Sequence, residues 1–114
     1  MSKTRATKDY RNTKGRFRVC TFTLNNFTIL EYEKIISLEA QLKILIFQSE
    51  IGNNGTPHLQ GMAQISAART LSSWKKLFGS NKIHIEQCRN IIASKKYCQK
   101  EDTWDSKIRF VKTD

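Results

Sequence analysis

The hydrophobic and polar positions along this chain divide it into two kinds of segment. Five segments are rich in β-branched and aromatic residues, with apolar side chains mostly at every second position, which is typical of strands. Three others place apolar residues three or four positions apart, which indicates amphipathic helices. The predicted strands are residues 18–24, 42–50, 56–65, 82–86 and 107–112, and the predicted helices are residues 28–40, 70–78 and 90–101.

Local signals mark several boundaries of these segments. Thr28 followed by Glu31 is a capping-box pattern, which predicts the start of a helix. Thr70 is a suitable N-cap residue, and Gly79 is suited to end the helix that follows it. The glycines and asparagines of residues 52–55 can supply the positive φ angles of a hairpin turn. The second and third strands should therefore pair antiparallel.

The order of the predicted elements, β-α-β-β-α-β-α-β, indicates an α+β fold. Strands joined by hairpins and short helices form antiparallel sheets, and such a sheet commonly packs one face against a core. We expect the helices to cover one face of the sheet and the other face to be open to a ligand.

The net charge of the chain indicates which class of partner it binds. Lys and Arg number 20 and Asp and Glu number 10, which gives a net charge of +10. A polyanion such as nucleic acid is therefore the first partner to expect. The longest strongly apolar run, Ile44–Phe47, is far too short to cross a bilayer, so no membrane partner is expected. No apolar segment follows the basic N-terminus, so the chain is not expected to be secreted, unless a signal has been removed.

The positive charge is dense at the N-terminus. Residues 1–16 carry six Lys and Arg against one Asp, with few large apolar residues. This composition predicts a basic, flexible arm, followed by one globular domain at residues 17–114. With 114 residues, 39% of them hydrophobic, the chain can bury one core but not two.

Three cysteines, Cys20, Cys88 and Cys98, are scattered along the chain. Their number is odd and none forms a C-x-x-C pair, which favours free thiols in a reducing compartment over a disulfide framework. The same spacing argues against a structural or adaptor domain built on zinc.

The third predicted strand carries candidate metal ligands. Alternation places His58 and Gln60 on one polar face, and Glu50 lies just across the hairpin. An imidazole, an amide oxygen and a carboxylate suit Mg²⁺ or Mn²⁺ and are a poor set for structural zinc. The strand also has a plainer interpretation, in which His58 and Gln60 form a solvated face, and the strand taken alone favours that interpretation.

The last predicted helix carries Tyr97 and Lys100 three positions apart, which places them on one helical face. A tyrosine beside an ammonium group can act as a nucleophile, because the positive charge favours phenolate or steadies a developing phosphorane. The alternative is a rim tyrosine with its hydroxyl in water, beside an ordinary solvated basic face.

Three motifs in order resemble those of the replication-initiator (Rep) proteins of circoviruses, nanoviruses and related circular single-stranded DNA viruses. Cys20–Asn26 is similar to their first motif, Gly55–Gly61 to the second, metal-binding motif, and Lys96–Asp102 to the third, which holds a tyrosine and a lysine. His84–Glu86 is also similar to the family. The likeness covers about residues 17–104, nearly the whole globular part.

The resemblance implies an HUH endonuclease domain. Its fold would be RRM-like, a variant of the ferredoxin-like fold, with a five-stranded antiparallel sheet, helices covering one face and the active site on the other. Carried over to this sequence, Tyr97 would be the nucleophile, and Lys100 would assist at the metal or the phosphate. His58 and Gln60 would be ligands of Mn²⁺ or Mg²⁺, with Glu50 as the acidic ligand on the neighbouring strand. Gln60 stands where the superfamily has a second histidine, so weaker metal binding is expected.

The implied reaction is metal-dependent nicking and joining of single-stranded DNA at the stem-loop of a viral replication origin, which initiates rolling-circle replication. The tyrosine would form a 5′-phosphotyrosine link and release a 3′-hydroxyl, which can rejoin the strand. The candidate DNA-binding residues are Arg16, Arg18, Asn25, Asn26 and Lys96, although a turn explains the two asparagines equally well.

The resemblance also implies a location and a larger context. Family members act in the host nucleus. The chain contains no phosphate-binding G-x-x-x-x-G-K-[ST] loop, so we expect it to lack the helicase domain and to be the N-terminal domain of a longer protein. The isolated domain is expected to be a monomer, and a full-length protein could oligomerise.

The alternative function is a non-catalytic RRM-like module that binds single-stranded nucleic acid. Such a module stacks bases on aromatic side chains of its open sheet face. Alternation puts Phe17, Val19, Thr21 and Thr23 on one face of the first strand, which offers one aromatic ring. The third strand has polar side chains where this module would need phenylalanine or tyrosine, which favours the nuclease.

Overall fold

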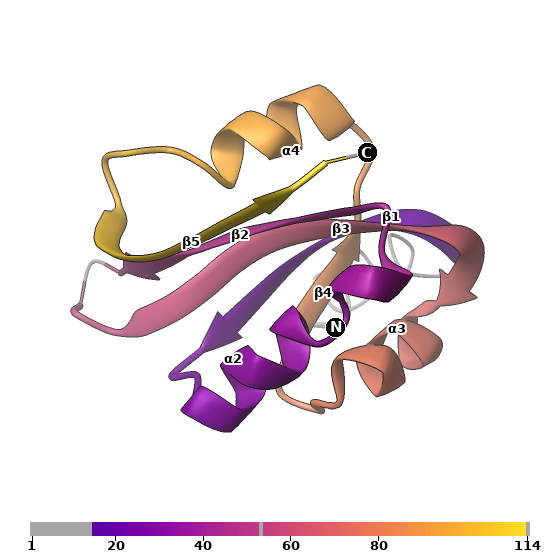
Figure 1. Ribbon diagram of the computed structural model, residues 1–114, viewed down its shortest axis with the longest axis horizontal. Helices are drawn as coiled ribbons and strands as arrows, with labels where there is room; N and C mark the ends of the chain where they lie inside the picture. Colours follow the sequence, from indigo (N-terminus) through magenta and orange to yellow (C-terminus); the bar gives the residue numbers. More distant parts are fainter. Residues whose placement is uncertain (1–14, 53, 114) are drawn as a thin grey trace, which may run out of the picture.

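The computed structural model of the chain describes residues 15–52 and 54–113. These residues form a five-stranded antiparallel sheet with three α-helices and one 3-10 helix (Figure 1). Across the sheet the strands follow the order β4-β1-β3-β2-β5. The elements are β1 Arg16–Asn25, α2 Ile29–Ile36, η1 Glu39–Gln41, β2 Ile44–Ile51, β3 Pro57–Thr70, α3 Leu71–Phe78, β4 His84–Gln87, α4 Ile91–Tyr97 and β5 Trp104–Lys112. The predicted α+β class, antiparallel sheet and order of elements are confirmed.

The helices lie on both sides of the sheet. In Figure 1, α2 and α3 lie below the sheet and α4 lies above it. The upper contact is a small apolar cluster, in which Ile91 and Cys98 pack against Ile44, Ile46 and Met62. Two helices therefore cover one face, as expected, and α4 lies against part of the other face.

The main core fills the space between the sheet and the two lower helices. Phe22 and Phe47 from the strands and Trp74 and Phe78 from α3 are each at most 2% exposed. The rings of Phe22 and Phe78 lie 4.9 Å apart, centre to centre. Burying one large apolar side chain contributes about 1.5–3 kcal/mol, so this face fixes the orientation of the sheet. The polar positions of the same strands must then point to the upper face.

Phe17 does not lie on the face that strict alternation predicts. The pairing of β1 with β3 shifts register between Phe17 and Val19. Between these two pairs β1 advances two residues while β3 advances five, from Gln64 to Arg69, and such an irregularity can reverse the sides of the residues before it. Phe17 is therefore 4% exposed in the main core, where its ring stacks on Trp74.

Two helices end earlier than predicted, and the reason is clear for α4. Its last residue is Tyr97, although the pattern predicts helix to residue 101. The carbonyls of Gln99 and Lys100 accept hydrogen bonds from Arg109, and Gln48 also donates to the Lys100 carbonyl. The backbone after α4 is thus bonded to the sheet instead of continuing the helix. α2 likewise ends at Ile36, after which the separate η1 forms.

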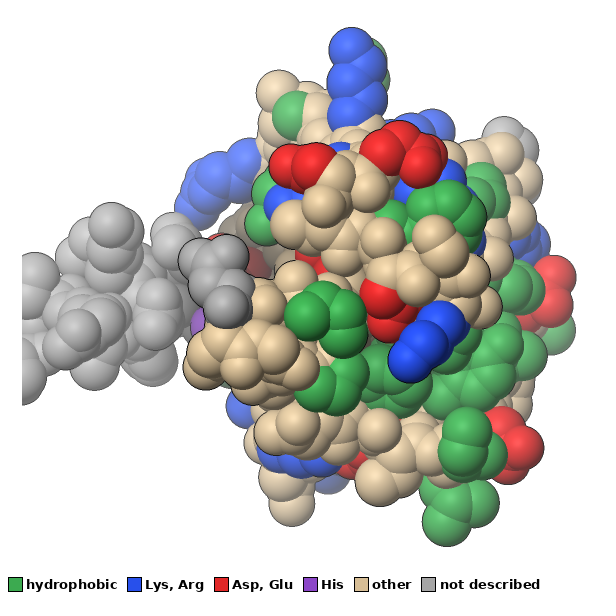
Figure 2. All heavy atoms as spheres, turned by 90° about the vertical axis from the view of Figure 1, so that its left-hand side faces the viewer, with side chains coloured by type: hydrophobic (Ala, Val, Ile, Leu, Met, Phe, Trp, Pro, Cys, Tyr) green, Lys and Arg blue, Asp and Glu red, His purple; other side chains and the backbone are tan. Residues whose placement is uncertain are grey.

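The predicted arm lies almost entirely outside the described residues, because the structure describes the chain from residue 15. The sequence places Arg16 in the arm, but this residue is the first of β1 and lies opposite Thr70. Every helix in the described ranges falls short of the length and apolar character that crossing a bilayer requires. Figure 2, which shows the left-hand side of Figure 1, has Lys and Arg side chains interspersed with acidic and hydrophobic ones.

Candidate active site

Two rows of side chains cross the upper face of the sheet. Because directly paired residues of antiparallel strands point to the same side, the strand registers define each row. The row nearer the β2–β3 hairpin, here called the hairpin row, runs through Asn25, His58, Glu50 and Trp104. The next row, here called the central row, runs through His84, Thr23, Gln60, Gln48 and Arg109.

Glu50 and His58 form the centre of the hairpin row. They are direct cross-strand partners, and Glu50 Oε1 lies 3.3 Å from His58 Nε2. The Glu50 side chain is 3% exposed and that of His58 is 18% exposed. The other carboxylate oxygen, Oε2, accepts a 2.9 Å hydrogen bond from Gln48 Nε2. One carboxylate oxygen and one ring nitrogen therefore face each other, with the imidazole partly open to solvent.

Gln60 lies two positions further along β3, on the same face as His58. Its Oε1 accepts a 3.0 Å hydrogen bond from Thr23 Oγ1. An amide oxygen has two lone pairs, so it can accept this bond and still donate to a cation. On the side of α4, the Cys98 thiol is within reach of Gln60. Burial raises the pKa of Cys98 to about 12, the negative charge of Glu50 adds to this rise, and the bond to Gln60 opposes it.

Tyr97 and Lys100 lie at the rim of this face. Tyr97 is the last residue of α4 and is 51% exposed. Lys100 lies beyond the helix end, so the predicted one-turn spacing on a helix is wrong, yet its Nζ still lies 4.1 Å from the centre of the Tyr97 ring. The turn after α4 brings the two together in place of helical geometry.

A hollow of about 260 Å³ is lined both by Tyr97 and by residues of the central row. His84 and Glu86 contribute to its lining from the edge strand β4, and His84 Nε2 lies 2.7 Å from Glu86 Oε2. The residues that line the hollow are Thr21, Phe22, Thr23, Gln60, His84, Glu86 and Tyr97. An extended chain lying in this hollow would contact both Gln60 and Tyr97.

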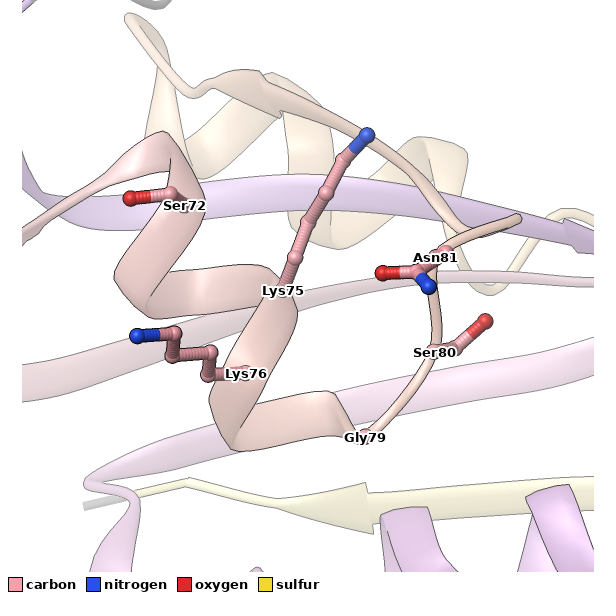
Figure 3. A pocket seen from close by; sticks show the side chains of 6 residues that line it. All are labelled: Ser72, Lys75, Lys76, Gly79, Ser80 and Asn81. Atoms are coloured by element: carbon pink, nitrogen blue, oxygen red, sulfur yellow. The ribbon is translucent and has the colours of Figure 1, made fainter.

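A second hollow, of about 340 Å³, lies away from these rows. Figure 3 shows it at the end of α3, where Lys75 and Asn81 extend beside the turn that Gly79 begins. Its lining residues are Ser72, Lys75, Lys76, Gly79, Ser80 and Asn81, none of which the sequence singles out as a ligand or nucleophile. We therefore locate the candidate site on the upper face, at the first hollow and the hairpin row beside it, because Glu50 and His58 do not line that hollow themselves.

The predicted DNA-binding residues are not gathered at one place. Asn25 is exposed at the end of β1, opposite His58. Asn26 has a φ of 52°, and its N–H donates to the Pro57 carbonyl, which is the behaviour of a turn residue. Lys96 is exposed on α4.

Arg16 and Arg18 are exposed at the opposite end of β1 from His58. At about 3.3 Å per residue, the nine steps from Arg16 to Asn25 span roughly 30 Å. These two arginines can contact only a distant part of a ligand that lies on the site.

The donor set fits a hard or borderline divalent cation better than zinc. Glu50, His58 and Gln60 offer a carboxylate, an imidazole and an amide oxygen on one face, which suits Mg²⁺ or Mn²⁺. Within residues 15–52 and 54–113, no three His, Cys, Asp or Glu side chains are grouped so as to hold a metal ion. A three-ligand set here therefore needs a donor of another type, and the Gln60 amide is the one that the sequence predicts.

Sequence reasoning missed several residues of the central row. Gln48 alternates with Glu50 on β2 and is a polar residue in a strand that is otherwise mostly apolar, which is a usable signal. For Thr23, alternation predicts a face but no role. Arg109 lies 61 positions from its partner Gln48, and nothing local in the sequence indicates their contact.

The chain is similar to known viral replication proteins. A family model described as "Putative viral replication protein" matches residues 17–101, the range that holds the three candidate metal ligands, the candidate nucleophile and Lys100. The replication-associated protein of canary circovirus is 37% identical over 83 residues, which are 71% of this chain and 28% of that protein. The replication-associated protein of pigeon circovirus is 40% identical over 85 residues, 70% of this chain and 25% of that protein.

A plant virus protein is also similar. The master replication protein of banana bunchy top virus is 31% identical over 91 residues, which are 78% of this chain and 29% of that protein. The chain therefore spans between a quarter and three tenths of the length of these three relatives.

Proposed function

This chain belongs to the viral replication protein family, and on that premise we propose that it nicks and rejoins single-stranded DNA at a viral replication origin. The observation that carries the proposal is the arrangement on the upper face. Glu50 and His58 face each other there across β2 and β3, and Gln60 lies two positions from His58 on the same face. The half-exposed Tyr97 side chain lines the same hollow as Gln60. This combination would supply both parts of a tyrosine-based DNA strand transferase, a cation site and an attacking oxygen.

Glu50, His58 and Gln60 would hold a divalent cation, Mn²⁺ or Mg²⁺. When bound, such a cation supplies positive charge to a non-bridging oxygen of the scissile phosphate. Glu50 brings a negative charge that is shielded from water, since its side chain is only 3% exposed. His58 and Gln60 bring neutral donors, and the bond from Thr23 Oγ1 keeps the Gln60 oxygen on the side facing β1.

Tyr97 would attack phosphorus through its phenolic oxygen. The new bond joins Tyr97 Oη to phosphorus while the bond from phosphorus to O3′ breaks. The phenolic proton leaves to water, and O3′ gains a proton to become a free 3′-hydroxyl. Lys100, whose ammonium group lies 4.1 Å from the ring centre, stabilises negative charge on the attacking oxygen. Attack by a 3′-hydroxyl on the phosphotyrosine reverses these steps and rejoins the strand.

The substrate we propose is the single-stranded part of an origin stem-loop. A phosphate must reach the sheet face between Tyr97 and the hairpin row, which an unpaired, extended strand can do more readily than a duplex. Asn25, beside His58, and the exposed Lys96, on the helix that ends at Tyr97, would contact neighbouring nucleotides. Action in the host nucleus is part of the same proposal.

The packing of aromatic rings supports the nuclease over a base-stacking module. Phe17 is buried in the main core. Trp104, which belongs to the hairpin row, is covered by the Arg109 guanidinium at 3.7 Å from its ring centre. The positions of β1 and β3 that face the site carry no Phe, Tyr or Trp between residues 19 and 25 or between residues 58 and 64. Stacking of bases as in RRM modules therefore has little support on this face.

The test uses the whole chain, Mn²⁺ and a pool of stem-loop oligonucleotides with a randomised loop, followed by denaturing electrophoresis. We expect a covalent protein–DNA adduct. Tyr97→Phe removes only the attacking oxygen, so it should lose both nicking and adduct while retaining single-stranded DNA binding. His58→Ala should lose cleavage and keep most of the DNA affinity, which depends on backbone charge.

Tyr32→Phe is the matched control, because Tyr32 lies on α2, on the opposite side of the sheet. It should nick and form adduct as the unchanged protein does. The proposal is refuted by robust nicking by Tyr97→Phe, or by mass spectrometry that finds the nucleotide on Tyr10 or Tyr32.

A further inference from the structure

The proposed reaction assigns no role to two residues of the central row, Gln48 and Arg109. Gln48 is fully buried, at 0% exposed, among apolar neighbours on β2. A buried amide is costly unless its polar atoms are hydrogen-bonded. Gln48 meets this condition completely. Its Nε2 donates to Glu50 Oε2 at 2.9 Å and to the Lys100 carbonyl at 2.6 Å, and its Oε1 accepts from Arg109 Nε at 2.8 Å.

The contact with Arg109 fixes which way round the Gln48 amide lies. A guanidinium has only donors, so the atom that faces Arg109 Nε must be the amide oxygen. The amide nitrogen then has to point away from Arg109, toward Glu50 and the Lys100 carbonyl. Arg109 thus determines, through Gln48, that a donor is aimed at the Glu50 carboxylate.

This donor fixes the orientation of Glu50. One carboxylate oxygen is held by Gln48, which leaves Oε1 facing His58 Nε2 at 3.3 Å. The amide between Glu50 and Arg109 is neutral. Arg109 therefore sets the orientation of the Glu50 carboxylate through Gln48, without direct contact between the guanidinium and the carboxylate. A guanidinium in direct contact would compete with a divalent cation for the same carboxylate oxygens.

Arg109 also holds the segment that carries Lys100. Its NH2 donates to the Gln99 carbonyl at 2.9 Å and to the Lys100 carbonyl at 3.3 Å, and its NH1 donates to Glu101 Oε2 at 2.8 Å. The face of the guanidinium lies 3.7 Å from the centre of the Trp104 ring, which restricts its plane. One side chain thereby links three successive residues after α4 to β5.

We infer that Gln48 and Arg109 are positioning residues of the site. Arg109 orients the Gln48 amide, Gln48 aims the Glu50 carboxylate at the cation position, and both hold the backbone of Lys100 beside Tyr97. The inference rests on the proposed function, because it concerns the roles proposed there for Glu50 and Lys100.

The test measures Mn²⁺ binding by isothermal titration calorimetry on the whole chain without DNA. Gln48→Met keeps the length of the side chain and removes its hydrogen bonds. Arg109→Lys keeps the charge and removes the forked geometry. Outer hydrogen-bond partners of metal ligands typically change affinity about 10- to 100-fold, so we expect Gln48→Met to weaken Mn²⁺ binding roughly tenfold or more, and Arg109→Lys to weaken it several-fold.

The double variant, Gln48→Met with Arg109→Lys, distinguishes a positioning role of Arg109 from a general loss of stability. If Arg109 acts on the cation site through Gln48, adding Arg109→Lys to Gln48→Met should weaken Mn²⁺ binding no further. Arg69→Lys is the matched control. Arg69 is also a partly buried arginine that bonds a backbone carbonyl, but it lies at the α3 end of β3, where it contacts Ser73. It should bind Mn²⁺ like the unchanged protein, and thermal melting checks that every variant is folded.

Nicking kinetics add a second readout. Since Arg109 holds the Lys100 segment directly, Arg109→Lys should lower the single-turnover rate at saturating Mn²⁺ while leaving the affinity for single-stranded DNA within about twofold.

The outcomes are distinguishable. Mn²⁺ affinity within about twofold of the unchanged protein in folded Gln48→Met overturns the inference alone. If that variant does not fold, unchanged affinity in Arg109→Lys overturns it in the same way. If the unchanged protein neither binds Mn²⁺ nor forms the adduct, the proposed function fails and the inference fails with it.

Discussion

Cys88 and Cys98 are ten positions apart in the sequence, yet they have different surroundings. Cys98 is fully buried at the end of α4, where burial raises the pKa of its thiol to about 12. Cys20 is also buried, and desolvation raises the pKa of its thiol well above the ordinary 9.0. Cys88 is partly exposed, and its Sγ lies 3.2 Å from Ser94 Oγ. Because the thiolate is the reactive form, the three thiols should differ in reactivity.

Alkylation with iodoacetamide at pH 8 tests this difference. With a pKa of about 12, roughly one Cys98 thiol in ten thousand would be ionised at that pH, even before burial limits access. We expect Cys88 to be alkylated at least about ten times faster than Cys98 or Cys20 in the folded protein, as followed by peptide mass spectrometry. In denaturant all three should react at similar rates. Equal rates for Cys88 and Cys98 in the folded protein would contradict the burial of Cys98.

At the scale of single elements, α2 illustrates a helix start that depends on pH. Glu31 Oε1 accepts a hydrogen bond from the Thr28 N–H at 2.8 Å, and the Glu31 N–H donates to Thr28 Oγ1 at 3.1 Å. The bond from the Thr28 backbone, with a smaller contribution from Lys82, lowers the pKa of Glu31 below its ordinary value of 4.5. A carboxyl whose pKa is lowered by folding stabilises the folded state at pH above its unfolded pKa.

Glu31→Gln should therefore destabilise the protein at neutral pH and not in acid. We expect a loss of about 0.5–1 kcal/mol at pH 7, since capping and exposed charge interactions are of that size. The difference should shrink as the pH falls below 4.5 and disappear once the folded carboxyl is protonated. Urea unfolding of both proteins between pH 3 and pH 7 measures it. A difference that stays constant over this range would show that charge on Glu31 plays no part.

The three central strands approach one another closely at Gly61. A Cβ added there would lie 2.5 Å from Phe22 Cζ, 2.6 Å from the Ile46 carbonyl oxygen and 2.6 Å from Phe47 Cβ. The carbonyl belongs to the paired strand β2 and cannot move without breaking the sheet. We expect Gly61→Ala to lower the free energy of unfolding by about 3 kcal/mol or more, at the upper end of overpacking effects. Urea unfolding monitored by tryptophan fluorescence measures this loss.

Gly52→Ala is the control for that substitution. The nearest atom to an added Cβ at Gly52 is the Thr56 carbonyl oxygen at 3.5 Å, which is ordinary contact. Its stability should change by less than about 1 kcal/mol. Equal losses for the two variants would mean that the close approach at Gly61 is not the cause.

At the scale of the whole molecule, the net charge of +10 sets the expected behaviour toward DNA. Residues 1–12 contain Lys3, Arg5, Lys8 and Arg11 against Asp9. Each phosphate contact on a single strand contributes about 0.7 to the slope of log affinity against log salt, so deleting residues 1–12 should reduce that slope by up to about 3. Binding should weaken most at low salt, while the adduct still forms at saturating DNA. Fluorescence anisotropy over a salt series measures the slope, and an unchanged slope would argue against an electrostatic arm.

The sequence by itself determined the class and order of the elements, because these depend on local periodicity and capping. The alternation of β3 put His58 and Gln60 on one face, and the short hairpin brought Glu50 opposite His58. Residues a few positions apart, or joined by a tight turn, have their relative placement set by backbone geometry alone. The motifs around His58 and Tyr97 likewise indicated the family, because a motif is a local string of residues, although their catalytic roles stay proposals.

Only the tertiary structure decided the surroundings of these residues. Phe17 changes face because a bulge forms where β1 pairs with β3. The helix that carries Tyr97 ends early because the backbone carbonyls that follow it accept hydrogen bonds from Gln48 and Arg109. Gln48 and Arg109 are 61 positions apart, and their bond exists only because β2 and β5 become neighbours in the sheet. Contacts between distant segments depend on how strands pair and helices pack, and no local pattern in the sequence encodes which side chains will then meet.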